Sequence, residues 1–134
     1  MQVLDLRRLP QVKRDMDLIR EILLRIEGNQ QMDGTREFYF RNAEEMGIPN
    51  CSTDELAYNL GLLIMAGFVD GAVGAVMPMV VRSLTWEGHE FLDNIKNDDI
   101  WQKTKRQFSN LSGVGLRIVA AFAEAELKKR LGLP

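Results

Sequence analysis

The amino-acid sequence predicts an α+β domain with a small antiparallel sheet, and three observations favour that class. A helical pattern ends at an Ala-Gly pair and leads into a short apolar strand at Phe68-Val69. A Gly- and Ala-rich stretch, residues 71–75, separates this strand from a returning one at residues 76–84. Thr85 follows directly and can cap a further helix. Helix, hairpin and capped helix in this order are typical of a winged helix-turn-helix domain, in which the hairpin forms the wing.

The first half of the chain predicts a helix, a short strand and a second helix. Residues 12–27 carry apolar side chains at three- and four-residue spacing, which indicates an amphipathic helix. Glu37 to Arg41 is rich in aromatic residues and predicts a strand. Ser52 or Thr53 can cap the next helix, which is expected to run to residue 66, and Ser52 with Glu55 has the spacing of a capping box. This helix takes the place of the recognition helix, the third helix of a winged helix-turn-helix.

The second half of the chain predicts helices after the hairpin. They cover residues 86–95, 100–108 and 112–131. Gly88 is the weak position of the first because glycine has low helix propensity, and Asp98-Asp99 are placed to cap the second. Trp86 and Trp101 are expected to be core anchors that hold the wing and the later helices to the first helix.

Length and composition predict one soluble globular domain. The chain has 134 residues, of which 27% are charged and 46% hydrophobic. The expected organisation is a leader at residues 1–11, a winged-helix core at 12–95 and a C-terminal helical extension at 96–134. This extension is expected to pack on the core and is a candidate dimerisation element.

Charge and cysteine content narrow the classes of function. The formal net charge of −2 implies no global attraction to nucleic acid or to an anionic membrane. The longest apolar runs, such as residues 62–66, are too short to span a bilayer, and the N-terminus lacks the apolar core of a signal peptide. The single Cys51 excludes an internal disulfide and a cysteine-based zinc site. We therefore expect a cytoplasmic protein that does not insert into a membrane.

Two blocks of sequence resemble a known family. These blocks are KRDMDLIREILLRIE at Lys13–Glu27 and LTWEGHEFLDNIKNDDIW at Leu84–Trp101. They are similar to the phage- and prophage-associated family called domain of unknown function 2513, and LAYNLGLLIMAGFVDG matches that family's helix ending in Ala-Gly. The resemblance covers roughly residues 12–131. It implies a winged-helix-like fold and a phage-type setting, and it implies no chemistry.

A winged helix suggests DNA binding, but the charges at the expected contact positions are of the wrong sign. Residues 53–66 contain no Lys or Arg, and residues 52–88 carry a net charge of −3. Phosphate contacts need cations. Residues 102–134 carry a net charge of +5; a solvated helix face is the favoured interpretation and a phosphate-contacting patch the alternative. The candidate nucleic-acid contacts are Arg7, Arg8, Lys103, Lys105, Arg106, Lys128, Lys129 and Arg130.

The sequence offers no constellation of catalytic or cofactor-binding residues. His89 is the only histidine, so the two-histidine HExxH zinc motif is absent. Cys51 has no basic neighbour to activate its thiol. Asp98-Asp99 could suggest a metal site but fits a helix cap better. We expect no enzymatic activity, no cofactor and no metal.

Apolar residues where a surface is expected favour binding to a protein. The last helix has a broad apolar side. Apolar stripes at this spacing are more often core than interface, yet winged-helix domains commonly dimerise through added terminal helices. The candidate interface residues are Ile64, Met65, Val114, Ile118 and Phe122. The leading hypothesis is a non-enzymatic phage- or prophage-type accessory protein, homodimeric, that acts through protein contacts with an unknown partner. The alternative is a winged-helix DNA-binding transcriptional regulator.

Overall fold

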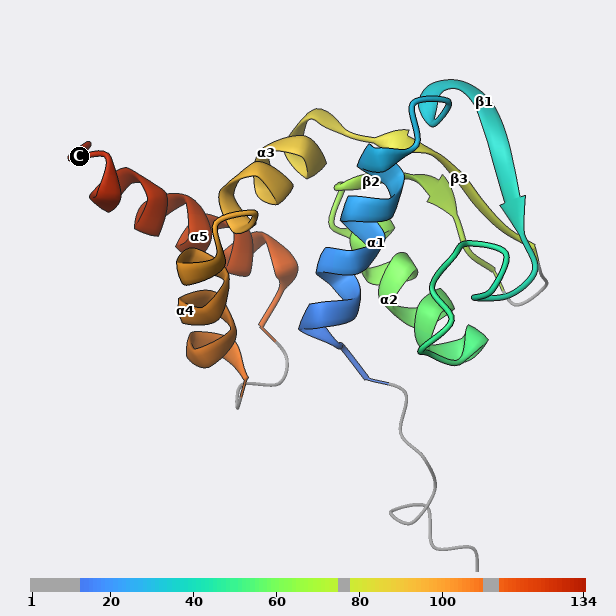
Figure 1. Ribbon diagram of the computed structural model, residues 1–134, viewed down its shortest axis with the longest axis horizontal. Coiled ribbons are helices and arrows are strands. Elements are labelled where there is room, and N and C mark those ends of the chain that lie inside the picture. Colours follow the sequence, from blue (N-terminus) through green and yellow to red (C-terminus); the bar gives the residue numbers. More distant parts are fainter. Residues whose placement is uncertain (1–12, 75–77, 110–113) are drawn as a thin grey trace, which may run out of the picture.

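The computed structural model describes residues 13–74, 78–109 and 114–134, and it is an α+β structure (Figure 1). The described part contains five helices and one three-stranded sheet. In chain order the elements are α1 (Met16–Gly28), β1 (Asp33–Phe40), α2 (Thr53–Met65), β2 (Val69–Ala72), β3 (Met79–Leu84), α3 (Trp86–Ile95), α4 (Asp98–Phe108) and α5 (Leu116–Arg130).

The sheet is antiparallel, with the strand order β1-β3-β2. Phe38, Tyr39 and Phe40 of β1 pair with Val81, Val80 and Met79 of β3. The register shifts once in each pair, between Asp33 and Phe38 in β1 and between Asp70 and Gly71 in β2. The central strand β3 buries Met79, Val81 and Leu84, so one face of the sheet closes the core.

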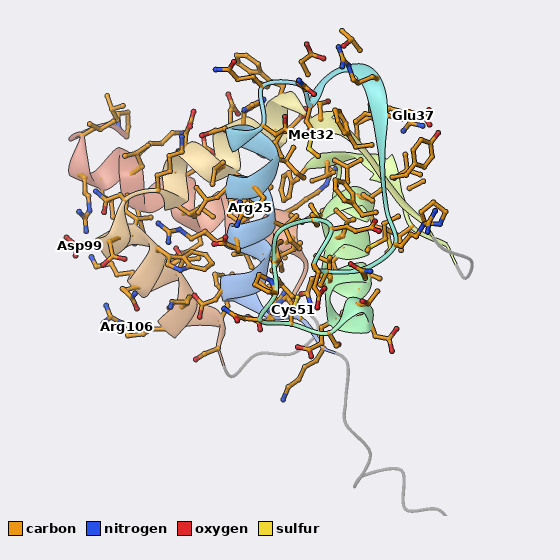
Figure 2. The ribbon with its side chains drawn as sticks, turned by 45° about the vertical axis from the view of Figure 1, so that its right-hand side comes forward. Arg25, Met32, Glu37, Cys51, Asp99 and Arg106 are labelled. Atoms are coloured by element: carbon orange, nitrogen blue, oxygen red, sulfur yellow. The ribbon has the colours of Figure 1, made fainter. Side chains whose placement is uncertain are left out.

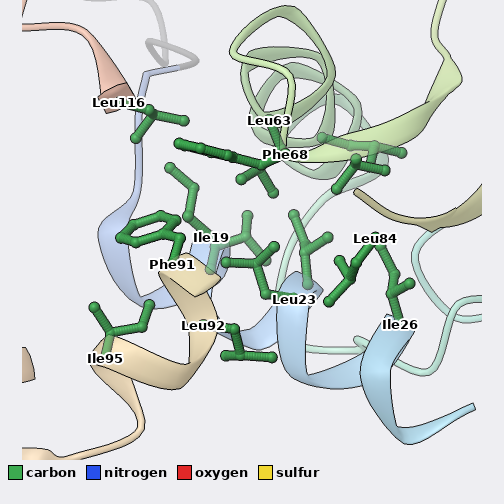
Figure 3. Close-up of a cluster of buried hydrophobic side chains, with 14 of the residues drawn as sticks. Ile19, Leu23, Ile26, Leu63, Phe68, Leu84, Phe91, Leu92, Ile95 and Leu116 are labelled. Atoms are coloured by element: carbon green, nitrogen blue, oxygen red, sulfur yellow. The ribbon is translucent and has the colours of Figure 1, made fainter. Parts of the chain in front are cut away.

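Helix α1 lies at the centre of the molecule, against α2, α3 and β3 (Figure 1). Asp15 caps it, because its carboxylate accepts a hydrogen bond from the backbone N–H of Leu18 at 3.1 Å. Figure 3 shows its apolar side chains packed against residues of α2, α3 and β3 and against Phe68, which precedes β2. The labelled members of this cluster are Ile19, Leu23, Ile26, Leu63, Phe68, Leu84, Phe91, Leu92, Ile95 and Leu116.

Helix α2 has well-defined ends and is fixed to α1 by a buried amide. Ser52 and Glu55 form the expected capping box. At the other end Gly67 has φ +85° and its N–H donates to the carbonyl of Ile64, while that of Phe68 donates to Leu63, which is a Schellman motif. Asn59 is fully buried; its Oδ1 accepts from the N–H of Asp15 at 2.8 Å, and its Nδ2 donates to the carbonyl of Lys13.

Helix α3 begins at Thr85, as expected, and approaches the start of β2 closely. The Thr85 hydroxyl accepts from the N–H of Gly88 and donates to the carbonyl of Gly67. A Cβ on Gly88 would lie 1.9 Å from the carbonyl oxygen of Phe68. The weak position of the helix is therefore also the point at which no larger residue fits.

The C-terminal helices α4 and α5 pack against α3 and each other (Figure 1). Trp101 anchors α4 on α1: it is 2% exposed and its Nε1 donates to Asp17 at 3.2 Å. Phe122 of α5 makes an edge-to-face contact with Phe108 of α4, with ring centroids 5.4 Å apart. Gly132, with φ +69°, ends α5 in a second Schellman motif.

Several element boundaries differ from those expected. The first helix begins at Met16 because Asp15 caps it, and the first strand extends back to Asp33. Asn97, and not Asp98-Asp99, caps α4 through a bond from the N–H of Ile100. The expected helix start at Ser112 lies outside the described residues, and α5 is described from Leu116. Residues 76 and 77 of the expected strand at 76–84 also lie outside them, and β3 is described from Met79.

The expectation that Trp86 is a core anchor is wrong. Its side chain is 74% exposed, whereas Trp101 is buried as expected. Helix α3 buries Gly88, Phe91, Leu92 and Ile95, which recur at helical spacing. Trp86 lies two residues before this series and therefore off the buried face.

Candidate protein interface at the C-terminal end of α2

Three exposed apolar side chains come from segments that meet at the end of α2. Met65 is 82% exposed, Trp86 74% and Ile118 60%. They belong to α2, α3 and α5 respectively. We call these three residues the α2-end patch.

Backbone hydrogen bonds hold the three segments at one turn, residues 66–68. Arg117, which precedes Ile118, donates from Nε to the carbonyl of Ala66 at 3.0 Å. Thr85, which precedes Trp86, donates from Oγ1 to the carbonyl of Gly67 at 2.5 Å and from its N–H to Phe68 at 3.1 Å. The Arg117 guanidinium also lies over Gly67, where an added Cβ would come within 3.1 Å of Nη2. The turn at the end of α2 therefore brings together the three segments that carry Met65, Trp86 and Ile118.

A pocket of 240 Å³ lies between α3 and α5, and its lining includes Ala66, Glu87 and Arg117, which are sequence neighbours of the three patch residues. Its wall is apolar where Phe68, Phe91 and Ala120 line it. The polar lining is mainly acidic and comprises Glu87, Glu90, Asn94, Arg117 and Glu124. A partner that uses this pocket therefore meets apolar surface with carboxylates at its edge.

The structure distributes the five sequence-predicted interface residues between the surface and the core edge. Met65 and Ile118 are exposed and belong to the patch. Ile64, Val114 and Phe122 are partly buried and pack against the core. Arg14 donates a hydrogen bond to the carbonyl of Val114.

The predicted nucleic-acid contacts are mostly paired with carboxylates of the chain itself. Arg7 and Arg8 lie outside the described residues. The salt bridges of the other candidates are Lys103–Glu126 at 3.5 Å, Lys105–Asp17 at 3.0 Å, Lys128–Glu124 at 3.5 Å, Lys129–Glu126 at 3.2 Å and Arg130–Asp99 at 3.4 Å. Arg106 is exposed on the outer side of α4, as is Asp99 (Figure 2). These pairings reduce the positive field that a phosphate backbone needs.

The helix expected to read DNA presents acidic and apolar groups to solvent. Asp54, Tyr58 and Met65 are exposed along α2. The carboxylates of Asp54 and Glu55 suit the positive end of the helix dipole. They would repel phosphate at the place where a recognition helix contacts it.

The residues with reactive side chains lie apart from one another. Burial raises the pKa of the Cys51 thiol, which lowers its thiolate fraction and hence its reactivity. His89 Nδ1 is 3.8 Å from Glu27, whose other oxygen binds Lys96 Nζ at 2.5 Å. Among the described residues, no three His, Cys, Asp or Glu side chains are placed to share a metal ion.

A larger hollow of 590 Å³ lies between the end of α1 and β1. Phe38, Phe40 and Met32 form its apolar wall, and Arg25 and Glu45 carry its charges. Figure 2 shows Arg25 and Met32 on this side of α1. One cation and one anion give this hollow no net charge, so it points to no particular class of ligand.

Sequence comparison finds one matching family and one similar protein. The sequence pattern of the family described as "Hypothetical protein (DUF2513)" matches residues 13–115. An "Uncharacterized protein" of Haemophilus influenzae (strain ATCC 51907 / DSM 11121 / KW20 / Rd) is 32% identical over 104 residues, which cover 75% of this chain and 82% of the relative. No solved structure matches the chain. No helix in the described ranges is long and apolar enough to cross a bilayer.

The family match includes α1 to α4 and ends just before α5. Two of the three patch residues, Met65 and Trp86, lie within it, and Ile118 follows it. The extent of the match confirms the family that the sequence blocks at Lys13–Glu27 and Leu84–Trp101 resemble. The chain is a member of the hypothetical protein family DUF2513.

Proposed function

We propose that the protein is a non-enzymatic accessory protein that acts by binding other proteins through the α2-end patch. The proposal includes a cytoplasmic, phage- or prophage-type setting, for which the support is the family resemblance. It also includes self-association as a homodimer. The observation that carries it is the meeting of the segments of Met65, Trp86 and Ile118 at one turn. Large exposed apolar side chains gathered in one place are typical of protein-binding surfaces.

A winged-helix assignment is part of this proposal and accounts for the strand order. In the described chain α1 precedes β1, α2 precedes β2, and β3 returns between the other two strands. The turn at residues 43–48, with Gly47 N–H bonded to Glu44 and Ile48 N–H to Ala43, takes the place of the second helix. A winged helix would make α2 the recognition element and the β2–β3 connection the wing.

The alternative function, a DNA-binding regulator, follows from the same fold assignment. Its support is the strand order. The charges oppose it, because α2 offers phosphate no cation and the basic side chains of α4 and α5 are largely paired. We therefore place protein binding first.

Site-specific photocrosslinking in cells tests the proposal. A photoreactive phenylalanine would be placed at Met65 and, separately, at Trp86. The matched control is Tyr39, an aromatic residue that is also exposed but lies on β1. Discrete protein adducts are expected at positions 65 and 86 and not at 39. An absence of adducts at 65 and 86, or equal adducts at all three positions, would contradict the proposal.

A second measurement separates the two functions. Fluorescence anisotropy with random-sequence duplex DNA is expected to show no binding, at low or at physiological salt. Binding that weakens steeply with salt would show phosphate neutralisation and would favour the regulator.

A further inference from the structure

We propose that a second copy of this chain binds the outer side of α5, with the two α5 helices antiparallel about a two-fold axis. This inference rests on the proposed function, since it names one of the protein partners. The partner is identified by three properties of α5: an apolar outer face, an acidic neighbour at one end and a basic sequence at the other.

An apolar stripe runs along the exposed side of α5. Ile118, Ala121 and Ala125 are exposed and recur at three- and four-residue spacing. They lie apart from the buried residues Leu116, Val119, Ala123 and Glu126. Alanines at the middle of such a face allow the axes of two helices to approach closely.

Two hollows lie along this face and share lining residues, and we call them together the groove. The 240 Å³ pocket between α3 and α5 is lined by Ala121 and Glu124. A second hollow of 360 Å³ is lined by the same two residues and extends along α5 to Lys128 and Leu133. The groove therefore follows α5 through its second half to the end of the chain.

The groove has opposite charges at its two ends. Glu87 and Glu90 of α3 lie beside its first half, and the lining there also includes Arg117, so carboxylates outnumber cations. Within the described part of the chain no salt bridge involves Glu87 or Glu90. Lys128, Lys129 and Arg130 occupy the last turn of α5. Lys129 shares the carboxylate of Glu126 with Lys103, so this end keeps a positive excess despite its internal pairs.

An antiparallel two-fold arrangement brings the acidic end of each groove next to the basic end of the other. It places the basic end of each α5 beside Glu87 and Glu90 of the other copy, and Ala121 opposite Ala125. A parallel arrangement would instead place Lys128 to Arg130 of the two copies side by side, where they repel. The surface is thus self-complementary, as an isologous interface requires.

Sedimentation velocity of the full chain tests this dimer over roughly two decades of protein concentration. A monomer–dimer equilibrium that weakens with added salt is expected. Glu90→Lys and Lys128→Glu should each weaken the dimer at least ~10-fold. The double variant should recover most of that loss, because it restores opposite charges across the interface. Glu44→Lys, the same charge change at an exposed loop residue, should have no effect.

A steric variant supplies a test that does not depend on charge. Ala121→Arg adds a long side chain at an exposed position and should give a monomer with an unchanged melting transition. A wild-type chain that stays monomeric overturns the inference, and so does a dimer that survives Ala121→Arg. If adducts to other proteins still form at positions 65 and 86 in a monomeric chain, the dimer is excluded, and the part of the proposed function that concerns binding of other proteins through the α2-end patch stands.

Discussion

Helices α1 and α5 use their apolar residues in opposite ways. All five buried residues of α1 are large aliphatic side chains: Leu18, Ile19, Ile22, Leu23 and Ile26. The buried residues of α5 include one small side chain, Ala123, and one ionisable one, Glu126, while Ile118 points to solvent. No large apolar side chain of α1 is exposed, since Met16 and Leu24 are partly buried and the other five are buried, whereas Ile118 of α5 is exposed.

This difference shows where stability and binding are separated in the molecule. Around α1, each large side chain is surrounded on all sides, so its removal leaves a cavity. On the outer side of α5 and at the α2-end patch, apolar side chains contact solvent and can be changed without disturbing the core. Substitutions at the two places should therefore differ sharply in their effect on the free energy of unfolding.

The two tryptophans give the largest expected contrast. Trp101 of α4 packs against α1. Arg20 Cζ lies 5.7 Å and Lys105 Nζ 5.6 Å from its ring centroid. Trp101→Ala should lower the free energy of unfolding by ~3–5 kcal/mol because it leaves a cavity. Trp86→Ala should change it by less than about 0.5 kcal/mol, since that ring is exposed. Urea unfolding of both variants is the measurement, and equal losses would contradict the assignment of Trp86 to the surface.

Asn59 tests the junction between α1 and α2. Asn59→Ala leaves the N–H of Asp15 and the carbonyl of Lys13 without their partner. The expected loss is ~1–3 kcal/mol, the cost of unsatisfied polar groups in a part-buried site. Thermal unfolding measures it, with Asn50→Ala, an exposed position in the loop before α2, as the control. An equal melting temperature for Asn59→Ala and wild type would show that the junction contributes nothing.

Glu126 tests the contribution of two ion pairs, one within α5 to Lys129 and one to Lys103 of α4. The hydrogen bond from Lys129 is the main cause of its lowered pKa, and Lys103 adds to it. A carboxyl group with a lowered folded-state pKa stabilises the fold above its unfolded pKa, and this contribution is lost as pH falls through the folded value. Between neutral pH and about pH 3, wild type should therefore lose more stability than Glu126→Gln. Asp33 and Glu37 also have lowered pKa values, so the wild-type and variant curves must be compared directly.

The start of a helix can be predicted from the sequence where one residue is clearly the best N-cap candidate. Ser52 with Glu55 and Thr85 were assigned correctly, because each polar cap directly precedes an apolar helical pattern. Asn97 was missed in favour of Asp98-Asp99 because all three residues can cap a helix. The polar half of β1 was missed as well, since its exposed residues show no apolar alternation.

Other features depend on contacts that local sequence does not encode. Gly88 looks unfavourable by helix propensity, yet the approach of α3 to the Phe68 carbonyl requires it. Met65 was predicted as an interface residue because it is apolar where a surface is expected, and Ile118 because it belongs to an apolar stripe of the last helix. Trp86 was assigned to the core, although its offset from the Gly88–Phe91–Ile95 series indicated otherwise. That the three segments meet follows from the bonds of Thr85 and Arg117 to carbonyls of α2 and its end, which tertiary structure alone determines.

The smallest expected effect on stability belongs to Ile118, and it is the most informative about binding. Ile118→Ser replaces an exposed side chain on the outer face of α5. The free energy of unfolding should therefore change by no more than about 0.5 kcal/mol, as for ordinary surface substitutions. Leu116→Ser, two residues earlier and buried, should instead destabilise the domain, because it removes core volume and buries a hydroxyl. If Ile118→Ser reduces self-association or the crosslinking yield at position 65 while the fold is unchanged, the apolar surface of α5 acts in binding. A large loss of stability on Ile118→Ser would mean that this side of α5 belongs to the core and that the contrast with α1 does not hold.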